Sequence, residues 1–310
     1  MTNMSKLSYT FRGLIVPVLA PFTERLTLNL PIIPTYAKYL ADNGVNGVLV
    51  NGTTGEGMSM SVDERKHVAE SWANTVKETN QHLMIQVGGA PLPDVIELAK
   101  HAAKNKADSI LCLPELYFKP ANVNELIDYL KIIGEAAPKT PLLYYHFPVR
   151  SNVNLHMGKF LETIRNEIPS FVGIKFTSTN LEEGSQALRA DSKRFVVFQG
   201  SNEILSAGCA IGMDSCIPSS TNVFPENVQQ IVDAGMRGDG LKAREAQEKL
   251  NKALSIISKY GNWSAALKCA MSLITPINPG PTRPPNHRLT PEDVNSMSQE
   301  LQALGYSVKK

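Results

Sequence analysis

The chain has 310 residues, of which 43% are apolar and 19% charged, and its formal net charge at pH 7 is +2. This length and apolar content allow a large buried core and exclude a disordered chain. Acidic and basic residues are interspersed, which excludes the basic patches that bind nucleic acid or an anionic membrane surface.

The sequence also carries signals about its compartment. Residues 1–12 are polar, and no later run approaches the roughly 20 apolar residues of a membrane span. The cysteines, Cys112, Cys209, Cys216 and Cys269, form no C-x-x-C pair, so we expect free thiols in a reducing compartment. We therefore expect a cytoplasmic protein with no membrane and no nucleic-acid partner.

Short apolar runs alternate along the chain with stretches of helical periodicity. The runs are continuously apolar, which is typical of parallel strands covered by helices. No glycine-rich dinucleotide motif follows the first run, so the eight repeats favour a (β/α)8 TIM barrel over a doubly wound sheet. The expected strands are 14–19, 47–50, 83–87, 109–113, 141–145, 171–175, 195–198 and 215–217, and the expected helices include 32–43, 63–77, 92–105, 124–137, 203–211 and 225–236.

Three further helices are expected after the barrel, over 241–260, 262–275 and 291–304. A proline-rich turn precedes the last of them, and Thr290 is its expected N-cap. We therefore predict an α/β protein with a (β/α)8 catalytic barrel over residues 10–237. A C-terminal helical extension over 238–310 is expected to pack on this barrel.

One lysine interrupts the apolar run 171–177. Lys175 stands where that run gives way to polar residues. Functional side chains of such a barrel lie at the carboxyl ends of its strands. An amine there loses hydration, which favours the neutral, nucleophilic form that Schiff-base formation needs. Lys175 is therefore the first candidate for a catalytic residue. The alternative is that it ends the strand and its side chain points into solvent.

Two other strand ends offer partners for this amine. Tyr145 ends the neighbouring strand, so its hydroxyl could shuttle the protons of carbinolamine formation and dehydration. The run Gly52-Thr-Thr-Gly55 offers closely spaced amides and the hydroxyls of Thr53 and Thr54, which suit a carboxylate or phosphate. The alternatives without a catalytic role are that Tyr145 is a core tyrosine and that the Gly52-Thr-Thr-Gly55 run is an ordinary βα turn.

The sequence predicts no metal site. Its six histidines show no metal-ligand spacing, and no acidic cluster resembles a cation site. Amine chemistry at a lysine needs no metal, so neither a metal nor an external cofactor is expected.

Four motifs, in this order, resemble the class I aldolase family of N-acetylneuraminate lyase and dihydrodipicolinate synthase. They are Asn51-Gly-Thr-Thr-Gly-Glu56, Tyr145-x-x-Pro148, Gly173-Ile-Lys175 with Thr177, and Gly200-x-x-Glu203. The resemblance covers roughly residues 10–275, and the set together is specific although each piece is short. Residues 50–70 and 143–148 look most like the animal lyase branch of the family.

The resemblance implies a reaction and a role for each matching residue. The reaction is cleavage of N-acetylneuraminate, a sialic acid, to N-acetylmannosamine and pyruvate through a lysine imine, without a metal. Lys175 would form the Schiff base and Tyr145 would shuttle protons. Thr53 and Thr54 would hold the carboxylate that becomes that of pyruvate. The sugar hydroxyls would meet Thr177, Gly200, Asn202, Glu203 and Ser219, and Tyr117 matches an aromatic that some members lend to a neighbouring subunit in a homotetramer.

Three residues depart from the lyase pattern. Asn202 stands where the lyases place an aspartate, which removes an anionic acceptor, and Pro218 replaces a glycine, which removes a backbone donor. Arg150 resembles a carboxylate-binding arginine of the synthase branch. Two alternatives therefore stay open. One is a related pyruvate-dependent aldolase or synthase acting on another aldehyde or 2-keto-3-deoxy acid, and the other is a sugar-acid-binding barrel without turnover.

Overall fold

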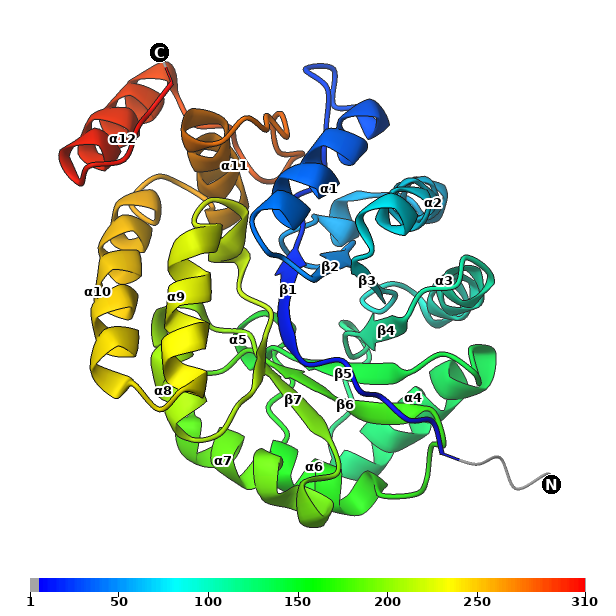
Figure 1. Ribbon diagram of the computed structural model, residues 1–310. Coiled ribbons are helices and arrows are strands. Elements are labelled where there is room, and N and C mark those ends of the chain that lie inside the picture. The colour runs from blue at the N-terminus through cyan, green and yellow to red at the C-terminus, as the bar shows by residue number, and fades with distance from the viewer. Residues whose placement is uncertain (1–5, 310) are drawn as a thin grey trace.

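The computed structural model describes residues 6–309. Its parallel strands pair in sequence order and close into a barrel that helices surround (Figure 1). The predicted (β/α)8 barrel is therefore confirmed. The strands are β1 Gly13–Pro17, β2 Gly47–Val50, β3 His82–Gln86, β4 Ser109–Cys112, β5 Leu142–His146, β6 Phe171–Phe176, β7 Val196–Gln199 and β8 Ser215–Cys216.

The helices follow the strands in alternation, and short 3-10 turns lie in several of the loops. The α-helices are α1 Ile33–Asp42, α2 Val62–Thr79, α3 Leu92–Lys104, α4 Val123–Ala136, α5 Pro148–Ser151, α6 Met157–Ile164, α7 Leu181–Arg189, α8 Leu205–Ala210, α9 Pro225–Met236, α10 Gly240–Ile257, α11 Trp263–Ile274 and α12 Pro291–Ala303. The 3-10 turns are η1 Leu30–Ile32, η2 Gly57–Ser59, η3 Ala190–Lys193, η4 Asn202–Ile204 and η5 Ser219–Asn222.

One predicted helix, 203–211, is wrong in its first turn. The chain forms the 3-10 turn η4 there, and α8 begins only at Leu205. Ile204 precedes α8 with a φ of −134°, which lies outside the helical region, so a continuous α-helix is interrupted. This break leaves Asn202 and Glu203 on a turn at the barrel mouth.

The strands bury side chains on both faces. Inward-facing side chains such as Leu49, Leu111 and Phe198 fill the barrel, whereas outward-facing ones pack against the helices. Tyr144 and Tyr145 illustrate this alternation, because Tyr144 packs in the outer layer and Tyr145 in the barrel interior. The polar end of Tyr145 therefore lies where the barrel core meets its mouth.

The amino ends of the strands are covered by residues that precede β1. Tyr9 and Phe11 pack against the barrel core, and their rings contact those of His82 and Phe198. The Tyr9 hydroxyl lies 3.0 Å from His82 Nε2, which in turn lies 2.9 Å from the Ser109 hydroxyl. This end of the barrel is thereby filled, and the opposite end carries the pocket.

The C-terminal helices lie along one side of the barrel, where α10 packs against α9 and α8 (Figure 1). Thr290 precedes α12 and forms a capping box with Asp293, so the predicted N-cap is confirmed. The boundary at residue 237 between barrel and extension stays a prediction. Among residues 6–309, no helix combines the length and the apolar character needed to cross a bilayer.

Candidate active site

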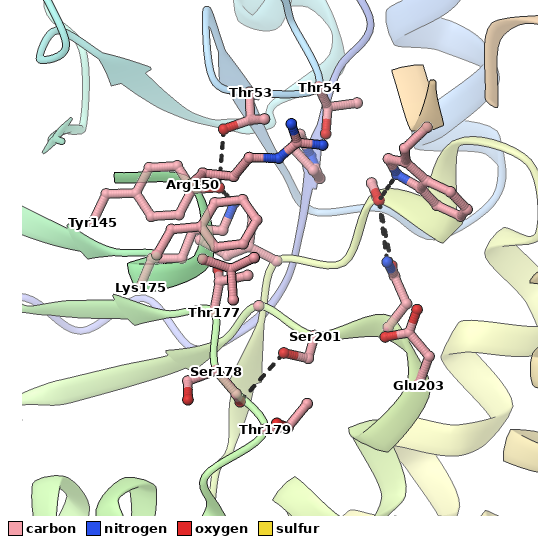
Figure 2. A pocket seen from close by; sticks show the side chains of 18 of the residues that line it. Thr53, Thr54, Tyr145, Arg150, Lys175, Thr177, Ser178, Thr179, Ser201 and Glu203 are labelled. Carbon is pink, nitrogen blue, oxygen red and sulfur yellow. Dashed lines mark hydrogen bonds between the residues drawn. The ribbon is translucent and has the colours of Figure 1, made fainter. Parts of the chain in front are cut away.

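A pocket of about 320 Å³ opens at the carboxyl ends of the strands. It is lined by every residue that the sequence predicts for the site except Tyr117. Figure 2 shows Lys175 and Tyr145 on one side of this pocket, with Thr53 and Thr54 next to them and Glu203 across from them. The fold therefore brings together side chains from strand ends that are far apart in the sequence.

Lys175 and Tyr145 form the buried centre of the site. β5 and β6 pair in a register that places these two residues side by side, so both side chains point to the same face of the sheet. Lys175 Nζ lies 3.2 Å from the Tyr145 hydroxyl and 4.3 Å from the centroid of its ring. Only 3% of Lys175 and 2% of Tyr145 are exposed. An amine held beside a phenol in this way suits imine formation with local proton transfer.

The GTTG loop, defined as residues 51–57, follows β2 and reaches the same centre. The Thr53 hydroxyl lies 3.4 Å from the Tyr145 hydroxyl. Within residues 6–309, the amides of Thr53 and Thr54 donate to no protein acceptor. Two free amides beside two hydroxyls form a cradle for a small anion such as a carboxylate.

The shape of the GTTG loop is tightly determined. Its turns are closed by the Glu56 amide, which donates to the Thr53 carbonyl oxygen, and by the Gly57 amide, which donates to that of Gly52. Gly57 is needed because a Cβ there would lie 2.1 Å from the Asn51 carbonyl oxygen. The loop thus cannot shift without breaking its own close contacts.

Asn202, Ser219 and Trp263 form a hydrogen-bonded group on the other side of the pocket. Asn202 Oδ1 accepts the Ser220 amide at 3.0 Å, which fixes the orientation of the side-chain amide. Asn202 Nδ2 lies 3.3 Å from the Ser219 hydroxyl, and Trp263 Nε1 donates to that hydroxyl at 3.0 Å. The Ser219 hydroxyl also lies 3.4 Å from Asn202 Oδ1, to which it can donate its hydrogen.

Gly200 and Thr177 lie in close contact between these two sides. A Cβ at Gly200 would lie 2.0 Å from the Thr177 hydroxyl oxygen, so only glycine fits. The Thr177 amide donates to the His146 carbonyl oxygen at 2.9 Å, which fixes its backbone. The Thr177 hydroxyl is itself buried without a partner among the described residues. Its hydrogen-bonding capacity is therefore unused within the described residues.

The remaining predicted residues lie at the rim. Arg150 on α5 and Glu203 on η4 are exposed and line the pocket. Tyr117 lies outside the pocket of its own chain, with 82% of its surface exposed next to the equally exposed Phe118. Its predicted contribution to a neighbouring subunit stays a prediction.

The pocket has a net positive charge. Its charged lining residues are Lys175, Arg150 and Glu203, which favours an anionic substrate. Burial lowers the pKa of His146 to about 4, so this ring is neutral near pH 7 and adds no charge behind Tyr145. No group of three His, Cys, Asp or Glu side chains within residues 6–309 is arranged as metal ligands would be.

Sequence reasoning did not assign a role to several lining residues. Trp263 and Ser264 come from the start of α11, in the part predicted as a helical extension. A tryptophan after an N-cap carries no local signal of its distant contact with Ser219, so only the tertiary fold reveals it. The other lining residues without a predicted role are Pro17, Phe147, Val149, Ser178, Thr179, Ser201 and Ile217.

Comparisons with known proteins agree on one family. The model of the dihydrodipicolinate synthetase family matches residues 10–304. The N-acetylneuraminate lyase of Mus musculus is 33% identical over 297 residues, which cover 95% of this chain and 93% of its own length. The structure of the Proteus mirabilis N-acetylneuraminate lyase matches with a TM-score of 0.90 at 31% identity, covering 97% of this chain and 100% of that chain. The sialic acid aldolase of Aliivibrio salmonicida also matches with a TM-score of 0.90, at 32% identity and 98% coverage of both chains.

Proposed function

Because the chain belongs to the dihydrodipicolinate synthetase family, we propose that it is a Schiff-base aldolase that cleaves N-acetylneuraminate to N-acetylmannosamine and pyruvate. The observation that carries this proposal is the 3.2 Å contact between Lys175 Nζ and the Tyr145 hydroxyl, buried at the base of the pocket. The enzyme is then a carbon–carbon lyase that acts on a small anionic sugar.

The first step joins the substrate to the enzyme. Lys175 Nζ attacks the ketone carbon of the open-chain sugar acid, and the carbinolamine loses water to give an iminium ion. Tyr145 supplies the proton that the leaving water needs, because its hydroxyl lies beside the amine. Thr53 and Thr54 hold the carboxylate next to the reacting carbon.

The second step breaks the C3–C4 bond. The C4 hydroxyl loses its proton to Tyr145 or to the carboxylate of the substrate, and the iminium ion accepts the electron pair of the cleaved bond. N-acetylmannosamine leaves and an enamine remains on Lys175. Protonation at C3 and hydrolysis then release pyruvate. Every step is acid–base or iminium chemistry, so we propose that no cofactor is needed and that EDTA leaves the rate unchanged.

The other side of the pocket is proposed to bind the sugar. Thr177, Gly200, Asn202, Glu203 and Ser219 present hydroxyl, amide and carboxylate groups that suit a polyhydroxy chain. All five residues line the pocket, and Glu203 lies across it from Lys175, which supports this role. This assignment implies that changes here alter sugar affinity more than imine formation.

An assay of pyruvate release tests the proposed reaction. The protein should release pyruvate from N-acetylneuraminate, and the Lys175→Ala variant should not. The second candidate is a synthase that joins pyruvate to another aldehyde, which Arg150 favours because this guanidinium lines the pocket and could bind a second carboxylate. Consumption of pyruvate only with aspartate semialdehyde would select that candidate, and the absence of both turnover and a borohydride-trapped adduct on Lys175 would select a binding protein.

We also propose a homotetramer in the cytoplasm. The side chains of Tyr117 and Phe118 support an interface, because they contact each other edge to face and are both 82% exposed. The four free cysteines support a reducing compartment. Light scattering of the purified protein should give four times the chain mass of 33.9 kDa, and a monomer would contradict this part of the proposal.

A further inference from the structure

A buried ion pair joins the end of the GTTG loop to α11, outside the pocket. Glu56 Oε1 is 2.6 Å from Lys268 Nζ, and the two side chains are 1% and 3% exposed. The pair connects the loop after β2 to α11 in the C-terminal part of the chain. Burying two charges costs hydration free energy that their attraction does not always recover, so stability alone is a weak reason for such a pair. Its position next to the pocket points to another role.

Glu56 has an unusual backbone conformation at the end of the loop turn. Its φ of 46° and ψ of 34° place a residue with a side chain in the left-handed region. Strain of this kind persists where the surroundings determine the conformation. The Glu56 carboxylate holds the residue in this conformation. Its Oε1 pairs with Lys268, and its Oε2 accepts the amide of Arg283 at 3.2 Å.

Lys268 is equally well fixed at the other end of the pair. Its Nζ donates to the Pro281 carbonyl oxygen at 2.7 Å and lies 4.6 Å from the centroid of the Phe22 ring. Trp263 and Ser264 line the pocket about one helical turn earlier on the same α11. The ion pair therefore joins two walls of the pocket, the GTTG loop and α11.

We infer that Glu56 and Lys268 are positioning residues that hold the GTTG loop in the shape that binds the substrate carboxylate. This inference rests on the proposed function. The Glu56 amide closes the turn on Thr53, so release of the Glu56 side chain loosens the amides and hydroxyls of Thr53 and Thr54. Neither member of the pair lines the pocket. Their loss therefore weakens carboxylate binding while the Lys175–Tyr145 chemistry is retained.

The decisive variant is the double substitution Glu56→Gln/Lys268→Met. It removes both charges and nearly conserves both volumes, whereas either single change leaves one buried charge unpaired and risks unfolding. Arg288→Met is the matched control. It removes an ion pair between Arg288 and Glu24 that ties the same extension to another loop, at 2.6 Å and with both side chains largely exposed.

The full-length variants are treated with pyruvate and borohydride, and the fraction of Lys175 that is trapped is measured against pyruvate concentration. We expect the half-saturating concentration of the double variant to rise about tenfold, because misplaced binding groups weaken a positioned complex. The maximal trapped fraction should stay at the wild-type level. Hydrogen exchange should become faster in residues 51–57, and the Arg288→Met variant should match the wild type in both measurements.

Two results would overturn the positioning role. One is a double variant with wild-type pyruvate dependence and wild-type exchange of the GTTG loop. The other is faster exchange spread over the whole chain, which indicates a general contribution to stability. A wild type that forms no imine at all contradicts the proposed function instead. In that case, faster exchange confined to residues 51–57 still supports the role of the pair in holding the loop.

Discussion

The two sides of the pocket are built differently. The proposed imine side, made of Lys175, Tyr145 and the GTTG loop, comes from strand ends and is buried, with Lys175 and Tyr145 almost closed to solvent. The polar side, made of Asn202, Glu203, Ser219 and Trp263, comes from the 3-10 turns η4 and η5 and the start of α11. Asn202, Glu203 and Trp263 are more exposed than Lys175 and Tyr145, and hydrogen bonds join Asn202, Ser219 and Trp263 to one another.

In the proposed mechanism, this difference separates the chemistry from the choice of substrate. Strand register places Lys175 and Tyr145 beside each other, so their geometry depends on the pairing of β5 and β6 in the barrel. The polar side depends on short turns, where a single substitution changes donors and acceptors without altering the barrel. Changes on the imine side should therefore affect turnover most, and changes on the polar side should affect the preference among sugars.

The largest effect is expected for Lys175→Ala. Without the amine no imine forms, so the electron pair of the cleaved bond has no acceptor, and kcat should fall by about 10⁴-fold or more. Pyruvate release from N-acetylneuraminate measures this loss, with circular dichroism as the check that the barrel is retained. A variant that keeps more than about a tenth of the activity would remove Lys175 from the mechanism.

The next largest effect is expected for Tyr145→Phe. Loss of the hydroxyl removes the proton shuttle beside Lys175 Nζ, and kcat should fall by about 10²- to 10⁴-fold. Tyr144→Phe is the matched control, because that side chain is buried in the outer layer away from the pocket. Equal losses in the two variants would contradict the role of Tyr145.

Asn202→Asp should strengthen the binding of the sugar by the polar side. An ionised carboxylate accepts stronger hydrogen bonds from sugar hydroxyls than an amide does, and it still accepts the Ser220 amide. We expect kcat/KM for N-acetylneuraminate to rise by up to about tenfold, which corresponds to about 1.4 kcal/mol. Trapping with pyruvate should stay unchanged. A lower kcat/KM would show that this side binds a group other than a hydroxyl donor.

The smallest effect is expected for Trp263→Phe. The variant loses the bond from Nε1 to the Ser219 hydroxyl but keeps an aromatic ring at the pocket wall. Loss of one neutral hydrogen bond should raise KM for the sugar acid about threefold, with kcat nearly unchanged. An equal change in the pyruvate dependence of trapping would mean that Trp263 acts on both sides of the pocket.

The sequence predicted the imine side better than the polar side for a physical reason. Apolar runs mark the strands, and the strand ends of a parallel barrel meet at one mouth, so Lys175 and Tyr145 could be placed together. The turn η4 was predicted as a helix because Glu203 begins a stretch of helical periodicity, and only the backbone at Ile204 shows the break. Trp263 could not be assigned, since its partner Ser219 is distant in sequence.

The ion pair between Glu56 and Lys268 could not be predicted from the sequence either. Glu56 appeared as the last residue of a loop motif, and Lys268 is the single charged residue in the predicted helix 262–275, whose sequence does not indicate its partner. Their pairing depends on how α11 packs against the barrel, which no periodicity encodes. Tyr117 differs, because the sequence predicted it for the site only through family resemblance. In the single chain its side chain is exposed to solvent.

Borohydride trapping tests the central claim, that Lys175 forms an imine with a 2-keto acid. The protein is incubated with pyruvate, reduced and digested, and the peptide that contains Lys175 is weighed by mass spectrometry. We predict a covalent adduct on Lys175 that requires pyruvate and is absent from the Lys175→Ala variant. An unmodified Lys175 peptide, or an adduct on another buried amine such as Lys268, would contradict the account.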